Sequence, residues 1–158
     1  MAEVQAGEVV SLRICVGSRE PMKVVEEITV IKDEGIEGDR HRRASINQQY
    51  SDAASVSARA QSQVLLMDRE TLGKFDLTDG LIRENVTVEG LRFLEIKQGD
   101  RLQLGEEVIL EITGLCDPCG RMDEIRDGLK DELEGQRGLL AYSESGGVVK
   151  VGDRIKSL

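Results

Sequence analysis

The sequence predicts a mainly β fold, a barrel or a sandwich, with only a few short helices. Short runs of β-forming residues recur along the chain, and 17 glycines, against two prolines, fall between them. Only one longer stretch repeats its apolar residues at helical spacing. The chain has 158 residues, which is the length of one ordinary domain of about 100–200 residues. We therefore expect residues 1–158 to form a single domain.

The expected strands follow from apolar runs rich in β-formers. In residues 8–16, Val10, Leu12 and Ile14 are expected to share one face, and residues 24–32 are rich in β-branched side chains. Further strands are expected at 63–67, 85–88, 101–104, 108–113, 139–142 and 148–151, the last two separated by a turn at 145–147. Gly-Asp-Arg occurs at 38–40, 99–101 and 152–154, and the last two copies predict turns that lead into strands at Leu102 and Ile155.

Helical signal is limited to two places. Apolar residues recur at spacings of three and four at Met122, Ile125, Leu129 and Leu133, which predicts one amphipathic helix after the last cysteine. Gly128 lies inside this helix, at a cost of about 1 kcal/mol relative to alanine. A shorter helix is expected at 69–74.

Residues 44–62 have an unusual composition, because 13 of the 19 are Ala, Ser or Gln. Because this segment has few apolar side chains, their burial would offset little of the conformational entropy lost on ordering. We therefore expect a mobile surface insertion, with a short helix at 52–60 as the alternative. Such a loop is either a lid over a site or an inert insertion.

The charge and cysteine content narrow the expected partners and location. Lys and Arg number 21 and Asp and Glu 30, a net charge of −9, which argues against broad nucleic-acid binding. The N-terminus has no signal-peptide pattern, and no window has the roughly 18 apolar residues of a membrane span. Three cysteines are too few for a secreted disulfide scaffold. We therefore expect a cytoplasmic protein that binds neither nucleic acid nor membrane.

The first candidate site is the sequence Cys116-Asp117-Pro118-Cys119. The reactive form of cysteine is the thiolate, which forms more readily near a helix N-terminus or an arginine. Cys119 directly precedes the predicted helix, and Arg121 lies two residues after Cys119. Cys119 is therefore the expected functional sulfur, and Cys116 is the expected resolving thiol. Cys15, in a predicted strand, is expected to be structural. A zinc site, a thioredoxin-like dithiol and inert buried cysteines are the other interpretations.

The second candidate site is the run of glycines and basic residues from 35 to 43. Arg40, His41 and Arg42 lie together in a chain that is otherwise acidic, and guanidinium groups bind phosphate in a bidentate manner. A solvated turn with surface arginines is the alternative. Arg83-Glu84-Asn85 is a third, weaker candidate, since Arg can clamp an anion and Asn can bond a ligand.

Taken in order, several short motifs resemble the MOSC domain, the family named after the C-terminal part of molybdenum cofactor sulfurases. The motifs span about residues 7–155, and the whole chain resembles the small stand-alone type. They are Gly35-Ile36-Glu37-Gly38-Asp39-Arg40-His41, Gln63–Asp68, Arg83–Leu91, Gly99-Asp100-Arg101-Leu102, Cys116-Asp117-Pro118-Cys119, Gly138 and Val151-Gly152-Asp153.

The resemblance implies a barrel, a sulfur site and an anion site. Cys119 matches the family's characteristic cysteine, which implies a persulfide carrier or a molybdenum ligand. The family's Gly-Asp-x-His stretch matches Gly38, Asp39 and His41, and its Glu-Asn pair matches Glu84 and Asn85. The implied cofactor is the pyranopterin molybdenum cofactor. The residues expected to hold it are Gly38, Asp39, Arg40, His41, Arg42, Arg83, Glu84, Asn85 and Arg121.

Two functions are compatible with this resemblance. The chain is a sulfur carrier or molybdenum cofactor-binding module, supplied by a separate pyridoxal phosphate-dependent cysteine desulfurase or serving a molybdenum cofactor enzyme. Alternatively, it is a molybdenum cofactor-dependent reductase of N-hydroxylated compounds. Two departures from the family bear on both: the Ala/Ser/Gln-rich insertion follows His41 closely, and no second domain carries a desulfurase or reductase activity.

Overall fold

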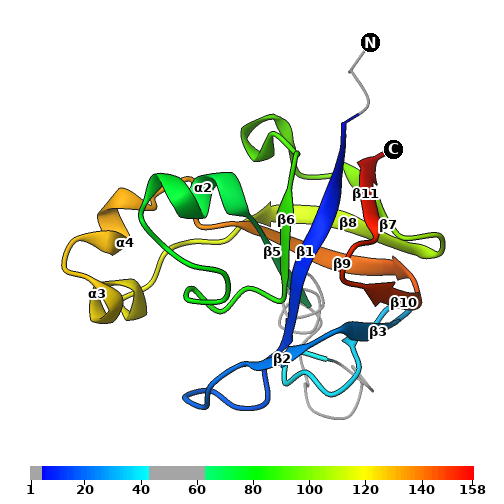
Figure 1. Cartoon of the computed structure of the whole chain (residues 1–158), viewed down its shortest axis with the longest axis horizontal. Helices are drawn as coiled ribbons and strands as arrows, with labels where there is room; N and C mark the ends of the chain where they lie inside the picture. Colours follow the sequence, from blue (N-terminus) through cyan, green and yellow to red (C-terminus); the bar gives the residue numbers. More distant parts are fainter. Residues whose placement is uncertain (1–4, 43–62) are drawn as a thin grey trace, which may run out of the picture.

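The computed structural model, which describes residues 5–42 and 63–158, is mainly β, as the sequence predicts. Its strands are β1 (Ala6–Ile14), β2 (Lys23–Val25), β3 (Glu27–Ile31), β4 (Gly35–Ile36), β5 (Val64–Asp68), β6 (Val86–Glu89), β7 (Arg101–Leu104), β8 (Val108–Leu115), β9 (Leu139–Ser145), β10 (Gly147–Lys150) and β11 (Arg154–Ser157). Seven of them form a closed barrel in the order β11-β7-β8-β9-β5-β6-β1, with β11 pairing back to β1. The mainly β barrel is therefore confirmed (Figure 1).

One further strand and a three-stranded sheet complete the β structure. β2 pairs with the far end of β1, outside the closed barrel, and β3 pairs with β10 and β4 in a separate sheet. The single predicted strand over 24–32 is thus two strands, β2 and β3, and β4 is one that the sequence did not indicate. The predicted Gly-Asp turns are confirmed, since Gly99 and Gly152 have positive φ and lead directly into β7 and β11.

One connection in the barrel is a parallel crossover. β5 and β6 pair in parallel, and such a pair needs a long connection between its strands. That connection includes α2 (Arg69–Lys74), which coincides with the predicted short helix and whose N-cap is Asp68. The crossover ends at Arg83-Glu84-Asn85, immediately before β6. It therefore fixes the third candidate site at the start of a barrel strand.

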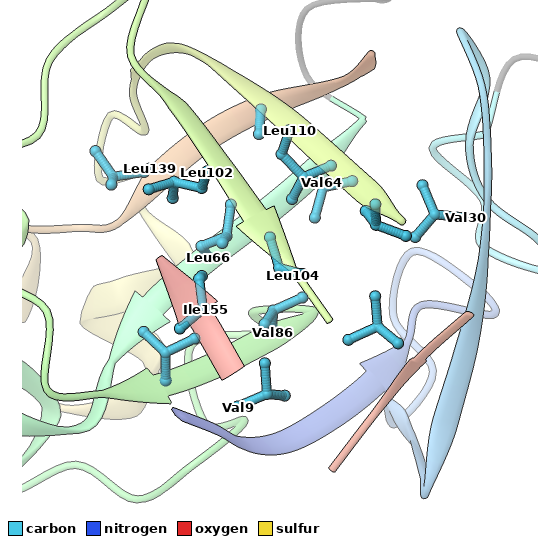
Figure 2. Packing of buried hydrophobic residues seen from close by; sticks show 14 of the residues in the cluster. Val9, Val30, Val64, Leu66, Val86, Leu102, Leu104, Leu110, Leu139 and Ile155 are labelled. Carbon is cyan, nitrogen blue, oxygen red and sulfur yellow. The ribbon is translucent and has the colours of Figure 1, made fainter. Parts of the chain in front are cut away.

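The barrel interior is filled by apolar side chains from every strand of the barrel. The labelled residues of Figure 2 point into this core, and burial of each Val, Leu or Ile stabilises the fold by roughly 1.5–3 kcal/mol. The labelled core residues are Val9, Val30, Val64, Leu66, Val86, Leu102, Leu104, Leu110, Leu139 and Ile155.

The prediction that Val10, Leu12 and Ile14 share one face of β1 is wrong at Val10. The register with β6 shifts between Val9 and Ser11, so Val10 is an inserted residue of the bulge type. Val9 and Leu12 are fully buried, whereas Val10 is only half-buried. The alternation that the sequence suggested does not continue through a bulge. Beyond it, Arg13 is 4% exposed.

The predicted amphipathic helix after Cys119 is two helices. α3 (Arg121–Ile125) and α4 (Leu129–Glu132) are separated by an extended Arg126 and by Gly128, whose φ of 85° is left-handed. The apolar positions are nevertheless buried or half-buried. They pack with residues of β5, α2 and the crossover in a second core, which consists of Met67, Leu72, Leu77, Ile82, Met122, Leu129 and Leu133, with Phe75 and Ile125 at its edge.

Two predictions are left open. The insertion at 44–62 and its alternative helix at 52–60 lie outside the described residues. The single domain over residues 1–158 stays a prediction.

Among the described residues, no helix has the length and apolar character needed to cross a membrane.

Candidate functional site

The segment Cys116–Gly120, here called the cysteine segment, connects β8 to α3. The backbone N–H of Cys116 donates to Gly138 O at 2.9 Å, so the segment leaves the barrel beside the start of β9. All three cysteines are free thiols. Cys119 is exposed, Cys116 is half-buried and Cys15 is buried. The predicted functional thiol is thus the one that an external molecule can reach.

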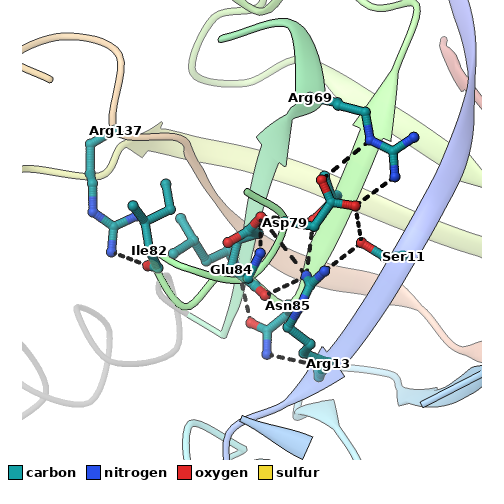
Figure 3. Close-up of polar contacts among 11 residues, drawn as sticks. Ser11, Arg13, Arg69, Asp79, Ile82, Glu84, Asn85 and Arg137 are labelled. Carbon is teal, nitrogen blue, oxygen red and sulfur yellow. Dashed lines mark hydrogen bonds and ion pairs between the residues drawn. The ribbon is translucent and has the colours of Figure 1, made fainter. Parts of the chain in front are cut away.

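Cys116 lies in the field of a buried arginine. Burial raises the pKa of the Cys116 thiol, and the charge of Arg137 acts in the opposite direction. The Arg137 residue is 7% exposed, and its Nη2 donates to Ile82 O at 2.7 Å (Figure 3). Its Nε and Nη1 are buried and have no hydrogen-bond partner. Sequence reasoning missed Arg137, although the residue directly precedes Gly138, which belongs to the motifs quoted above.

Two predicted arginines converge on the loop that follows β1. Arg83 donates to Glu20 O and Gly17 O, both at 2.8 Å, and to the Cys15 sulfur at 3.3 Å. From α3, Arg121 donates to Ser18 O. The structure therefore brings Arg83 and Arg121 together around this loop. The guanidinium of Arg121, expected beside Cys119, is hydrogen-bonded to the loop.

The same loop also contacts α3 through an ion pair. Arg19 and Glu124 lie 2.9 Å apart, and both are mostly exposed, so this pair adds little stability. It does show that the loop after β1 and the helix after Cys119 are neighbours. Residues near positions 18 and 121, far apart in the sequence, thus share one surface.

The residues of the Gly-Asp-x-His stretch are organised around the Asp39 carboxylate. Its Oδ2 accepts from the Cys15 N–H and from Asn85 Nδ2, both at 2.8 Å. Its Oδ1 accepts from the backbone N–H of His41 at 2.8 Å and lies 3.0 Å from His41 Nδ1. Although burial by itself raises the pKa of Asp39, these hydrogen bonds outweigh it and hold the pKa below its ordinary value. Gly38 precedes Asp39 with a φ of 87°.

Asn85 links three parts of the fold. Its side chain donates to Arg13 O at 3.2 Å and to Asp39, and it accepts from Leu65 N at 3.0 Å. Asn85 therefore ties β1 and β5 to the stretch that carries Asp39. Its side-chain donors and acceptor are occupied by protein groups.

Glu84 is completely buried beside Arg13. Its Oε2 accepts from Thr87 Oγ1 at 2.7 Å and from Gly80 N at 3.0 Å, and it lies 3.8 Å from Arg13 Nη1. Arg13 also donates to Thr87 Oγ1 at 2.9 Å. Figure 3 shows these contacts continuing through Ser11 and Asp79 to Arg69. We call Arg13, Asp39, Glu84, Asn85 and Thr87 the polar hub.

The remaining basic residues of the second candidate lie near the hub. The backbone N–H of Arg40 donates to Cys15 O at 2.8 Å. Arg42 forms an ion pair with Glu34 at 3.0 Å, which offsets part of the local positive charge. The His41 side chain is 45% exposed, so it is reachable by an external molecule.

A cleft of about 390 Å³ has in its lining Leu115, the residue directly before the cysteine segment. It is bordered by Leu94, Leu115 and Leu139 and by the Asp68 carboxylate. Burial raises the pKa of Asp68, and its Oδ1 has no hydrogen-bond partner. The cleft is mainly apolar. Within residues 5–42 and 63–158, no group of three or more His, Cys, Asp or Glu could hold a metal ion.

Comparison with known proteins gives one family and several solved structures. The MOSC domain model matches residues 46–156. No curated protein sequence matches the chain. The YuaD protein from Bacillus subtilis superposes with a TM-score of 0.77 at 20% identity, over 99% of this chain and 98% of that one.

Two further solved structures have the same fold at lower identity. YiiM from Geobacillus stearothermophilus has a TM-score of 0.69 at 15% identity, over 99% of this chain and 75% of that one. YiiM from Escherichia coli has a TM-score of 0.65 at 14% identity, over 96% and 69%. At these identities, the likeness concerns the fold.

Proposed function

Because this chain belongs to the MOSC domain family, we propose that it carries sulfur, or holds the molybdenum cofactor, through the thiol of Cys119. The family is associated with the C-terminal domain of molybdenum cofactor sulfurases. The donor of the sulfur in this proposal is a cysteine desulfurase, and the place of action is the cytoplasm.

The observation that carries the proposal is the pairing of an exposed thiol with a second thiol three residues earlier, next to a buried cation. Cys119 is exposed, as an exchange of sulfur with another protein requires. Cys116 is half-buried and lies in the field of Arg137. An exposed cysteine beside a second, protected cysteine suits a sulfur that arrives from outside and is then held.

The chemistry of the predicted site residues also fits the molybdenum cofactor. A single exposed thiolate suits one bond to molybdenum, which binds soft sulfur ligands; when bound, the cofactor would supply a redox-active metal. Arg40, His41, Arg42, Arg83 and Arg121 would hold the anionic part of the cofactor, and Arg137 has N–H groups to spare for an anion. Gly38, Asp39, Glu84 and Asn85 would position this surface from within, since their polar atoms bond mainly to the protein.

The experiment expresses the protein in a host that makes the molybdenum cofactor and measures two quantities. One is the molybdenum content of the purified protein, and the other is the sulfane sulfur gained from a cysteine desulfurase. We expect Cys119→Ser to lose whichever of the two the wild-type protein has, and Cys15→Ser to retain it in the folded fraction. A wild-type protein that takes up neither would contradict the proposal.

The same experiment separates the carrier from the enzyme. A metal-free protein that accepts sulfur is a carrier. Stable molybdenum together with turnover of an N-hydroxylated compound would instead support the reductase. Arg40→Ala combined with Arg42→Ala, in a folded protein, is expected to weaken the retention of the cofactor without changing sulfur uptake from the desulfurase.

A further inference from the structure

Arg137 is a buried cation with unsatisfied donors. Only 7% of the residue is exposed, and a guanidinium group keeps its charge at any physiological pH. Ile82 O accepts from Nη2, whereas Nε and Nη1 have no partner. Among the residues that the structure describes, no carboxylate forms an ion pair with it. A buried charge without a counter-charge is costly, so this position is suited to an anion that the free protein does not contain.

Cys116 is the group on which such an anion could form. The Cys116 backbone is hydrogen-bonded to the residue next to Arg137, Gly138, at 2.9 Å. Arg137 and Cys116 also interact electrostatically, and the direction favours negative charge on sulfur. Burial raises the pKa of the free Cys116 thiol. A persulfide is a stronger acid than a thiol, and its terminal sulfur extends further from the backbone.

We propose that Arg137 holds the negative terminal sulfur of a persulfide on Cys116, and that Cys116 is where sulfane sulfur rests after it arrives on Cys119. This inference rests on the proposed sulfur chemistry and adds to it a second sulfur position and the residue that stabilises it. Cys119 is then the exposed entry position, and Cys116 is the protected one.

The transfer between the two cysteines balances without another reactant. The thiolate of Cys116 attacks the terminal sulfur of the Cys119 persulfide, so a bond forms from Cys116 Sγ to that sulfur. The bond from Cys119 Sγ to the same sulfur breaks, and its electron pair leaves on Cys119 Sγ. The Cys116 thiol loses its proton as it attacks, and that proton neutralises the Cys119 thiolate. The terminal S–H of the new Cys116 persulfide then gives its proton to water, which leaves the negative sulfur that Arg137 holds. The oxidation level of the pair is unchanged, so neither an oxidant nor a reductant is needed.

The test loads the purified chain with inorganic polysulfide, which requires no partner enzyme, and then traps all sulfur species by alkylation. Cleavage before Asp117 separates Cys116 from Cys119, so mass spectrometry of the two peptides reports how much persulfide each cysteine carries. In the wild-type protein we expect most of the persulfide on Cys116.

The variants test the role of Arg137. We expect Arg137→Gln to shift the Cys116 to Cys119 persulfide ratio toward Cys119 by about tenfold or more, because hydrogen bonds to charged groups are among the strong ones. Arg137→Lys keeps the positive charge, so its Cys116 to Cys119 persulfide ratio should lie between those of the wild-type protein and Arg137→Gln. Arg101→Gln is the control, because Arg101 is an exposed arginine on β7 paired with Glu144, and it should leave the ratio unchanged.

Each outcome decides the question. Persulfide confined to Cys119 in the wild-type protein overturns this inference and leaves the proposed function standing; this readout needs no variant, so it applies even if Arg137→Gln does not fold. A ratio unchanged in folded Arg137→Gln also overturns it. If neither cysteine takes up sulfur from polysulfide, the inference and the carrier function fail together.

Discussion

The polar hub and the cysteine segment are two polar regions that differ in how many of their polar groups have partners, although one hub atom, the buried Glu84 Oε1, also has none. In the hub, the Asp39 carboxylate accepts from three residues, and the side chain of Asn85 has partners for both its oxygen and its nitrogen. Around the cysteine segment, the two cysteines form no disulfide, the Cys116 Sγ contacts Asp117 O at 3.8 Å, and Arg137 has two nitrogens without partners. Both regions contain residue types that a sequence motif would assign to a site. The difference supports the proposal that the cysteine segment carries the reactive groups and that the hub positions the surface around it.

The largest expected effect comes from breaking the hub at its charge pair. Arg13→Ala leaves Glu84 fully buried without its counter-charge, and removal of one partner of a buried pair costs about 3–5 kcal/mol. Denaturant unfolding of the wild-type and variant proteins measures this loss. Arg13→Met combined with Glu84→Met is the control, because it removes both charges and should cost less than Arg13→Ala alone. A larger loss in the double variant would contradict the role given to the pair.

The next effect concerns the apolar support of the cysteine segment. Leu129 is fully buried in the second core beneath α3 and α4, so Leu129→Ala is expected to lower the free energy of unfolding by about 2–5 kcal/mol. Lys130→Ala, at the exposed neighbour, is the matched control and should change it little. A Leu129→Ala protein as stable as the wild type would show that the helices do not depend on this packing.

A smaller effect depends on pH. The pKa of Asp39 is below its ordinary value of 3.8 in the folded protein, so the folded state binds this proton less readily than the unfolded state. The stabilisation is therefore present above the unfolded pKa and is lost as the pH falls through the lower pKa of the folded state. Asp39→Asn should cost about 1–3 kcal/mol at pH 6, from lost hydrogen bonds to a charged group.

Unfolding curves of the wild-type and Asp39→Asn proteins between pH 6 and strongly acidic pH check this expectation. The difference between the two proteins should shrink as the pH is lowered through the titration of Asp39. A difference that stays constant over that range would mean that the Asp39 charge does not stabilise the hub.

The smallest effect on stability is expected in the cysteine segment itself. Cys119→Ser should change the free energy of unfolding by less than about 0.5 kcal/mol, because the side chain is exposed. Alkylation followed by mass spectrometry should also show Cys119 reacting faster than Cys116 at neutral pH, since burial raises the pKa of Cys116. Faster alkylation of Cys116 would reverse the assignment of the exposed entry thiol.

Local patterns predicted the elements that depend on local residues. The bounds of β7 and α2 agree with those expected, because alternation, capping and turn residues all lie within the segments concerned. The helix after Cys119 was predicted as one because periodicity does not register the left-handed φ of Gly128, although the cost of that glycine was noted. The inserted Val10 in β1 is set by pairing with β6, some 77 positions away (87 − 10), and cannot be read from alternation.

The candidate site was predicted in its residue types more than in its arrangement. The motifs identified the two cysteines, which lie between β8 and α3, and the Asp39, Glu84 and Asn85 positions, which the fold gathers near β1 and β6. The arrangement of Cys15 with Arg83, and the burial of Arg137 near Cys116, arise from contacts between distant segments. No local pattern marks an arginine as buried, because arginine is a surface residue in most contexts.

The pairing of β1 with β11 has a consequence for how fast the chain reaches this fold. The closing pair joins Ala6 to Lys156, a separation of 150 residues (156 − 6), and the barrel is complete only when it forms. Contacts between such distant positions require loop closure before they contribute any stability, so proteins rich in them fold in about milliseconds to seconds. Closure of the ring is thus expected to be the slow kinetic event, and amides of β1 and β11 should gain protection from hydrogen exchange later than those of the β7–β8 hairpin.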